Sequence, residues 1–187
     1  WTMNEACTAT GGSCDMDWVA QGVSIDSRTV EYGDLFIALV GPNMDGHKFV
    51  AQAFERGAVA AVVSRQPDNV DPSLPLLIVG DTQTALEGLG IFARDRVGAR
   101  ICAVTGSVGK TGTKEALRLV LSNQGRTSAN LGSLNNHWGL PLSLARMAAD
   151  TQFGVFEMGM NHAGEITPLS AMARPHVALI TTVEPVH

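Results

Sequence analysis

The sequence lacks an apolar run of the roughly 20 residues that a membrane-spanning helix needs. It also lacks a basic flank followed by an apolar core at its start, so nothing there resembles a secretion signal. Positive charge is not in excess, since the formal net charge of the 187 residues is −5. These absences argue against membrane insertion and against a nucleic-acid-binding surface. A phosphorylated substrate would need a local positive site instead.

Cysteine is scarce, and the three cysteines, Cys7, Cys14 and Cys102, are not spaced as metal ligands. We therefore expect reduced thiols in a cytoplasmic protein, and we expect that protein to be a monomer. The chain begins at Trp1 and stops at His187 directly after a strand-like run. We expect it to be a segment of a longer protein.

The overall composition is ordinary for a soluble globular protein, with 45% apolar and 17% charged residues. Two composition patterns meet near residue 80 and predict two α/β domains, residues 1–80 and 81–187. In the first domain, a shared apolar face predicts a helix over residues 47–56, which Gly57 would end. Short apolar runs separated by turn residues predict strands at Val23–Ile25, Leu35–Leu39, Ala58–Val63 and Leu76–Val79.

The second domain alternates regularly between helical and strand patterns. Asp81 or Thr82 can cap a helix that runs to about Val97. Strands are then predicted at residues 99–106, 126–129, 153–159 and 176–183, and helices at 110–123, 140–148 and 164–173. This order predicts a parallel sheet with right-handed crossovers, in which ligands gather at the carboxyl ends of the strands.

The stretch TGSVGKT, residues 105–111, lies between a predicted strand and a predicted helix, as a phosphate-binding loop does. Gly106 and Gly109 permit a tight turn whose N–H groups point at phosphate oxygens. Lys110 can reach the outer phosphates, and the Thr111 hydroxyl can bind Mg²⁺. Val104 stands where the common spacing has a glycine. A glycine-rich turn with a chance Lys-Thr pair is therefore the alternative.

Polar residues that follow other predicted strands extend this candidate site. Glu157 ends an apolar strand, so its carboxylate can complete the Mg²⁺ coordination that Thr111 begins, unless it is an exposed glutamate without a role. His187 follows another strand and could hold a second cation or a phosphate oxygen, or lie in a surface loop. Asn135 and Asn136 suit hydrogen bonding to a polar ligand, although turn chemistry alone accounts for them.

Four motifs together resemble the Mur ligases, the ATP-dependent amide-bond ligases of peptidoglycan precursor synthesis. They are TGSVGKT, NNHWGLP, EMGMNHAGEI and TTVEPVH, in the order and spacing of that family. The family's loop is Thr-Gly-x-x-Gly-Lys-Thr/Ser, which requires no glycine at the position of Val104. Residues 23–63 resemble the UDP-sugar-binding domain that two members share. The asparagine pair and GMNHAGEI resemble the member that adds D-alanyl-D-alanine more closely than the one that adds the third amino acid.

The resemblance implies a role for each matching position. Lys110 would contact the γ-phosphate of ATP, Thr111 and Glu157 would bind Mg²⁺, and His187 would lie near a second Mg²⁺. The loop with Asn135 and Asn136 would cover the active site. The positions that would hold the phosphates are Thr105, Gly106, Ser107, Val108, Gly109, Lys110 and Thr111. The positions that would approach the uridine nucleotide are Ser27, Arg28, Asn43 and Met44.

The substrates implied by the resemblance are ATP, UDP-N-acetylmuramoyl-tripeptide and D-alanyl-D-alanine. The terminal carboxylate of the tripeptide would attack the γ-phosphoryl group, and the dipeptide amine would then displace phosphate from the acyl phosphate. Lys110 and Mg²⁺ would offset the repulsion between the two anions of the first step. The family continues past His187 with further strands, a carbamate-forming lysine and a third domain. We therefore expect the 187-residue chain not to ligate alone.

Other functions carry some of the same signals. The Mur ligase that adds the third amino acid shares the first domain. Folylpolyglutamate synthetases share the short loop, but they are not expected to carry the DSR segment in front of it. A P-loop kinase or hydrolase, with residues 1–80 as an unrelated appendage, would also contain such a loop, and so would a nucleotide-binding module without enzymatic activity.

Overall fold

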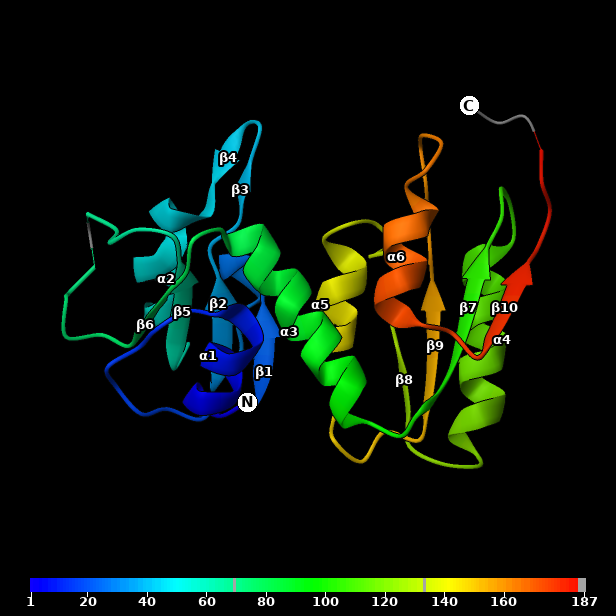
Figure 1. Ribbon diagram of the computed structural model, residues 1–187, viewed down its shortest axis with the longest axis horizontal. Coiled ribbons are helices and arrows are strands. Elements are labelled where there is room, and N and C mark those ends of the chain that lie inside the picture. Colours follow the sequence, from blue (N-terminus) through cyan, green and yellow to red (C-terminus); the bar gives the residue numbers. More distant parts are fainter. Residues whose placement is uncertain (69, 133, 185–187) are drawn as a thin grey trace. The chain divides into compact units, whose positions relative to one another are not determined.

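Helix α3 (Thr82–Arg96) begins where it is predicted, because Asp81 caps it by accepting a hydrogen bond from Thr84 N at 2.7 Å. Figure 1 shows the computed structural model, which describes residues 1–68, 70–132 and 134–184. Contacts divide the chain into two units between Leu89 and Gly90, inside α3 rather than near residue 80. The end of α3 belongs to the second unit, within which Arg94 Nε donates to Ala173 O at 2.7 Å.

The first unit contains a four-stranded parallel sheet in the order β1-β2-β5-β6. Its central strands are buried along their whole length, which is why they appear in the sequence as continuous apolar runs. All four strands fall on the predicted runs. They are β1 (Gly22–Ser24), β2 (Asp34–Ile37), β5 (Ala60–Val63) and β6 (Leu76–Ile78).

Short elements surround this sheet. The predicted helix over residues 47–56 is divided into a 3-10 turn, η2 (Gly46–Phe49), and a helix, α2 (Val50–Glu55), because Asp45 caps the turn through His47 N. Sequence patterns did not predict the remaining three elements. They are helix α1 (Met3–Thr10), the 3-10 turn η1 (Ser27–Thr29), and a hairpin of β3 (Val40–Gly41) and β4 (Met44–Asp45).

The second unit contains a parallel sheet, as the alternation of helices and strands predicts, and its strand order is β10-β7-β9-β8. Its strands are β7 (Arg100–Thr105), β8 (Thr127–Ala129), β9 (Phe153–Glu157) and β10 (Val177–Ile180). Its helices after α3 are α4 (Lys110–Ser122), α5 (Gly139–Ala145) and α6 (Ile166–Ala173). Each overlaps the helix predicted for it.

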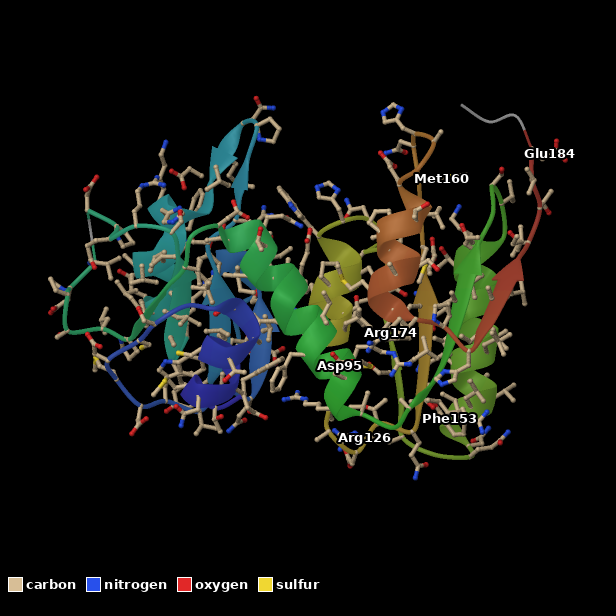
Figure 2. The ribbon with its side chains drawn as sticks, viewed as in Figure 1. Asp95, Arg126, Phe153, Met160, Arg174 and Glu184 are labelled. Carbon is tan, nitrogen blue, oxygen red and sulfur yellow. The ribbon has the colours of Figure 1, made fainter. Side chains whose placement is uncertain are left out.

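Strand alternation assigns the side chains of this sheet to two faces. Ile101 and Phe156 lie in a core with residues of α5 and α6, whereas α4 packs on the sheet through β7, β8 and β9. Glu157 follows Phe156 and therefore faces α4. Figure 2 shows Met160 and Glu184 at the edge where the strands end, and Arg126 and Phe153 at the opposite edge.

Gly139, the first residue of α5, packs against backbone. A Cβ added there would lie 2.2 Å from Leu134 C, whereas one added at Gly112, inside α4, would meet nothing within 4 Å. We predict that Gly139→Ala lowers the free energy of unfolding by about 1–3 kcal/mol, because the clash is with backbone. Gly112→Ala should raise it by roughly 0.5–1 kcal/mol through helix propensity. Urea denaturation followed by circular dichroism measures both, and equal shifts would contradict the prediction.

Candidate functional site

The carboxyl edge of the second sheet joins a glycine loop to a buried carboxylate. The loop runs from the end of β7 at Thr105 to the start of α4 at Lys110, and Glu157 is the last residue of β9. β7 and β9 are neighbours, with Val104 opposite Glu157 in the register. The structure thus brings together loop and strand end, residues that the sequence separates widely.

Glycine is required in this loop. Gly106 has φ 131°, and a Cβ added there would lie 2.2 Å from Thr181 Oγ1. Gly109 has φ 85° and precedes the first turn of α4. Val108 forms an isolated antiparallel β-bridge with Thr182. The loop leads directly into the N-terminus of α4, whose first backbone N–H groups suit an anion.

Lys110 curls back over the turn. Its ammonium donates to Gly106 O at 2.6 Å and to Ser107 O at 3.2 Å. The charge is thus held at the loop itself rather than directed into solvent. A cation at this position beside a helix N-terminus makes the loop a local positive site on a chain whose net charge is −5.

The other side of the loop is bound by the segment that follows β10. Ser107 N donates to Thr182 O at 2.6 Å, and Thr181 Oγ1 donates to Val108 O at 2.6 Å. Ser107 Oγ exchanges two 3.0 Å hydrogen bonds with the backbone of Glu184. These contacts fix the shape of the loop, and they use the Ser107 N–H. The candidate metal ligand His187 lies outside the described residues.

Glu157 is only 2% exposed, and both of its carboxylate oxygens accept hydrogen bonds. Thr111 Oγ1 donates to Oε2 at 2.8 Å, and Asn135 Nδ2 donates to Oε1 at 2.7 Å. A threonine hydroxyl and a carboxylate are oxygen donors of the kind that Mg²⁺ prefers, and each oxygen keeps a free lone pair. Thr111 and Glu157 are therefore placed to share one cation.

The two neighbouring asparagines do different things. Asn135 contacts Glu157, and its backbone oxygen accepts a hydrogen bond from Gly159 N at 2.9 Å. Asn136 Oδ1 instead accepts from Trp138 N and Gly139 N, at 3.1 and 2.9 Å, and so begins α5. The side chain of Asn135 thus belongs to the site, and that of Asn136 shapes the loop.

Lys114 and Asn130 also belong to this site, although sequence patterns did not identify them. Asn130 Oδ1 accepts a hydrogen bond from Glu157 N at 2.9 Å, and Lys114 Nζ donates to Asn130 O at 2.8 Å. The available signal was the position of Lys114, three residues after Thr111 and so on the same helix face. A lysine on a helix usually indicates the solvent-exposed side, so the sequence pattern did not single out Lys114 as a residue of the site.

Other features bear on what this unit could hold. In the described ranges, no three His, Cys, Asp or Glu side chains cluster as metal ligands. A cavity of about 510 Å³ lies along edge strand β8, not at the glycine loop. It is lined by β8, by Glu115 and Arg118 of α4, by Ser143 of α5 and by Arg146, which follows α5. Among the described residues, no helix is long and apolar enough to span a membrane.

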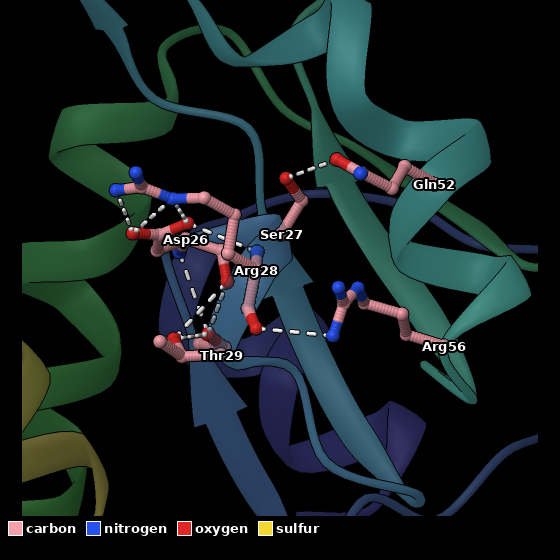
Figure 3. A network of polar contacts seen from close by, with 7 residues as sticks. Asp26, Ser27, Arg28, Thr29, Gln52 and Arg56 are labelled. Atoms are coloured by element: carbon pink, nitrogen blue, oxygen red, sulfur yellow. Dashed lines mark hydrogen bonds and ion pairs between the residues drawn. The ribbon is translucent and has the colours of Figure 1, made fainter.

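In the first unit, Ser27 and Arg28 lie in η1 within a polar network (Figure 3). Ser27 is buried and its hydroxyl donates to Gln52 Oε1 at 2.7 Å. Arg28 is paired with Asp26 at 2.7 Å, yet 80% of its side chain is exposed. The hydrogen bond from Arg28 lowers the pKa of Asp26. Arg28 is therefore oriented by its neighbour and still open to a ligand.

Asn43 and Met44 lie on the β3–β4 hairpin, a different element from η1. Both are exposed, and the hairpin is anchored one residue later by Asp45. Asp45 Oδ1 pairs with His47 Nδ1 at 2.7 Å, its other oxygen pairs with Arg65, and His47 Nε2 accepts from Ser64 N at 2.9 Å. Asp45, His47 and Arg65 border a cavity of about 120 Å³.

Comparison with known families identifies two matching domains. Residues 19–91 match the Mur ligase family, catalytic domain, and residues 104–187 match the Mur ligase middle domain. The two matches together cover most of the chain, and each falls largely within one of the two structural units.

Curated relatives match the same region. The UDP-N-acetylmuramoyl-tripeptide–D-alanyl-D-alanine ligase of Bacillus subtilis (strain 168) is 43% identical over 169 residues, which are 90% of this chain and 37% of the relative. The ligase of that name from Rickettsia prowazekii (strain Madrid E) is 41% identical over 165 residues, 88% of this chain and 36% of the relative. The chain thus spans less than two fifths of the length of these relatives.

Solved structures are also similar. The UDP-N-acetylmuramoylalanyl-D-glutamyl-2,6-diaminopimelate–D-alanyl-D-alanyl ligase of Acinetobacter baumannii has a TM-score of 0.84 and 38% identity, covering 96% of this chain and 41% of that one. The MurF ligase of Thermotoga maritima in complex with ADP has a TM-score of 0.69 and 32% identity, covering 89% of this chain and 38% of that one.

The interactions of Asp45 with His47 and Arg65 predict that the stability of the fold depends on pH. Burial raises the pKa of Asp45, but hydrogen bonds from His47 and Arg65 outweigh it and lower the pKa from 3.8 to about 2. Because the folded pKa is the lower one, the stabilisation is complete above the unfolded pKa and is lost as pH falls through the folded pKa.

We predict that wild-type protein loses more of its free energy of unfolding between about pH 4 and pH 2 than Asp45→Asn does. Asparagine keeps a carbonyl acceptor for His47 but does not titrate. Chemical denaturation across that range measures both proteins. Parallel pH profiles would contradict the prediction, because the other carboxyl groups are common to both.

Proposed function

Because the chain belongs to the Mur ligase family, we propose that it supplies the ATP-phosphate site of an amide-bond ligase that adds D-alanyl-D-alanine to UDP-N-acetylmuramoyl-tripeptide. The observation that carries the proposal is the 2.8 Å hydrogen bond between Thr111 and Glu157, placed beside the glycine loop and Lys110. Phosphoryl transfer depends on positioned charge. The loop with Lys110 supplies positive charge for the phosphates, and the Glu157 carboxylate supplies an oxygen ligand for a cation.

Each residue of the site has a proposed task. Backbone N–H groups of the glycine loop and of the first turn of α4 would bind phosphate oxygens, and Lys110 would leave its loop carbonyls to contact the γ-phosphate. Thr111 and Glu157 would hold Mg²⁺, which supplies the positive charge that lets a tripeptide carboxylate approach the γ-phosphoryl group. Asn135 would keep the Glu157 carboxylate in place. His187 is proposed as a ligand of a second Mg²⁺ on the resemblance alone.

The first unit is proposed to hold the UDP-N-acetylmuramoyl-tripeptide. Arg28 supports this role because its guanidinium is fixed by Asp26 and remains largely exposed, so it can meet an anionic group. The other proposed contacts are Ser27, whose hydroxyl keeps acceptor capacity, and the exposed hairpin residues Asn43 and Met44.

The similarity to relatives named as D-alanyl-D-alanine-adding ligases favours the dipeptide-adding ligase over the ligase that adds the third amino acid. A cytoplasmic monomer that takes part in peptidoglycan synthesis is the corresponding proposal for the whole protein. Activity, substrates and partners are all proposed at the level of a protein as long as these relatives.

Replacing the matching segment of the Bacillus subtilis relative with residues 1–187 of this chain tests the proposed reaction. We predict that the chimera joins D-alanyl-D-alanine to a UDP-N-acetylmuramoyl-tripeptide and releases ADP and phosphate in equal amounts. Tripeptides ending in lysine and in 2,6-diaminopimelate are both offered. Lys110→Ala in the chimera should slow the reaction by about 10²–10³-fold, because it removes charge at the transferred phosphoryl group.

Product analysis separates the alternatives. Addition of a diamino acid to the UDP-muramoyl dipeptide would assign the chain to the third-amino-acid ligase, and ATP hydrolysis without amide formation would favour a P-loop hydrolase. Calorimetry of UDP-N-acetylmuramoyl-tripeptide binding to the 187-residue chain adds a measurement that does not depend on the chimera. Failure of both product formation and binding would contradict the proposal.

The proposed metal ligand Thr111 has a test that needs no ligation. We predict that Thr111→Val raises the Mg²⁺ concentration needed for half-maximal ATP binding by about 10–100-fold, because valine keeps the shape and removes the oxygen. Thr111→Ser should restore most of the affinity. ATP titrations at fixed Mg²⁺ levels measure this effect, and equal Mg²⁺ dependence in the valine and serine variants would argue against a metal role.

A further inference from the structure

Lys114 is a cation with no exposed surface, inside a helix whose first turn forms the candidate site. Its ammonium donates to Asn130 O at 2.8 Å and to Gly132 O at 3.4 Å, and it pairs with Glu115 Oε1 at 2.9 Å. Hydrogen bonds from Arg118 and Lys114 lower the pKa of Glu115. Burying a charge is costly unless it is fully partnered, so the arrangement needs a reason.

Lys114 lies on the helix face that carries Thr111. Residues three apart on a helix are surface neighbours, so one face of α4 presents both the Thr111 hydroxyl and the Lys114 ammonium. Thr111 binds the carboxylate of Glu157. Lys114 binds the backbone that follows β8, the strand next to β9. The same helix face thus holds Glu157 directly and holds the chain beside it.

Asn130 continues the contact from that backbone to Glu157. The β8–β9 ladder ends with Ala129 opposite Val155, so Glu157 has no backbone partner from β8. Asn130, 1% exposed, takes that place with its side chain. Its Oδ1 accepts from Glu157 N at 2.9 Å, and its Nδ2 donates to Glu157 O at 3.1 Å and to Leu134 O at 2.9 Å.

Asn130 therefore forms hydrogen bonds with the backbone N–H and carbonyl of Glu157. Asn135, further along the same connection, donates from Nδ2 to Glu157 Oε1 at 2.7 Å. We propose that Lys114 and Asn130 are positioning residues that hold Glu157 in the geometry for binding Mg²⁺ with Thr111. Lys114 holds the connection after β8 against α4 through the Asn130 carbonyl. The Asn130 side chain in turn holds the Glu157 backbone at the end of β9. This inference rests on the proposed function, since it concerns the same metal site.

The test measures how nucleotide binding depends on Mg²⁺ in the 187-residue chain. Lys114→Met keeps the length of the side chain and removes its charge and donors. ATP binding is followed by calorimetry over a series of Mg²⁺ concentrations and in excess chelator. We expect the Mg²⁺ concentration for half-maximal binding to rise by about 10-fold or more, because partners that orient a metal ligand have effects of that size. Binding in chelator should not change, and excess Mg²⁺ should restore wild-type affinity.

Arg94→Met is the matched control. Arg94 is also a buried cation of the second unit, and it donates to two backbone carbonyls, Ala173 O at 2.7 Å and Arg174 O at 3.2 Å. Its substitution removes a comparable set of interactions and touches neither Glu157 nor the glycine loop. Thermal unfolding of both variants shows the loss of stability that they share. Only Lys114→Met should change the Mg²⁺ dependence.

Asn130→Ala is a second variant, since it shortens one neutral side chain and leaves the carbonyl that Lys114 binds. It should raise the Mg²⁺ requirement in the same direction, and it keeps the inference testable if Lys114→Met does not fold. The inference is overturned if folded Lys114→Met or Asn130→Ala has the Mg²⁺ dependence of Arg94→Met. Wild-type chain that binds ATP without any Mg²⁺ dependence would instead contradict the proposed function, and this inference with it.

Discussion

The burial of the Glu157 carboxylate is the constraint on which the site depends. An acidic side chain that is 2% exposed needs hydrogen-bond donors within the protein. Strand alternation determines on which face of the sheet these donors must lie. Because Phe156 occupies the core beneath α5 and α6, Glu157 must face α4. The first turn of α4 then has to present a donor, and Thr111 does so. The helix, the loop before it and the strand end are therefore fixed together.

The same constraint explains why so many polar groups gather at one strand end. Two side chains donate to the two carboxylate oxygens, and Asn130 satisfies the Glu157 backbone where β8 no longer pairs with it. Inside a protein, a polar network stabilises the fold only when every member is satisfied. Here the network spans α4, the connection after β8 and the end of β9. A change in any one of them would alter the position of the carboxylate.

Much of this could be predicted from the sequence, because buried parallel strands appear as apolar runs and the loop has its own signature. Strands β2 and β5, the start of α3 and the parallel direction of the strands in the second sheet follow from such patterns. Helix α1 was not predicted, although Thr2 and Glu5 form a capping box that signals its start. The roles of Asn130 and Lys114 could not be predicted. Sequence spacing does not show that a lysine is buried or that an asparagine replaces a ladder hydrogen bond.

Val104 connects the unusual loop spacing to this geometry. It stands where longer phosphate loops have a glycine, yet it is fully buried and lies opposite Glu157 in the β7–β9 register. Its carbonyl accepts a hydrogen bond from Met158 N at 2.9 Å, so the ladder continues to the end of the strand. β7 therefore stays extended through Thr105, and the turn begins only at Gly106. The shorter loop is what keeps β7 paired with β9 as far as the carboxylate, and so places the lysine, the threonine and Glu157 at one edge.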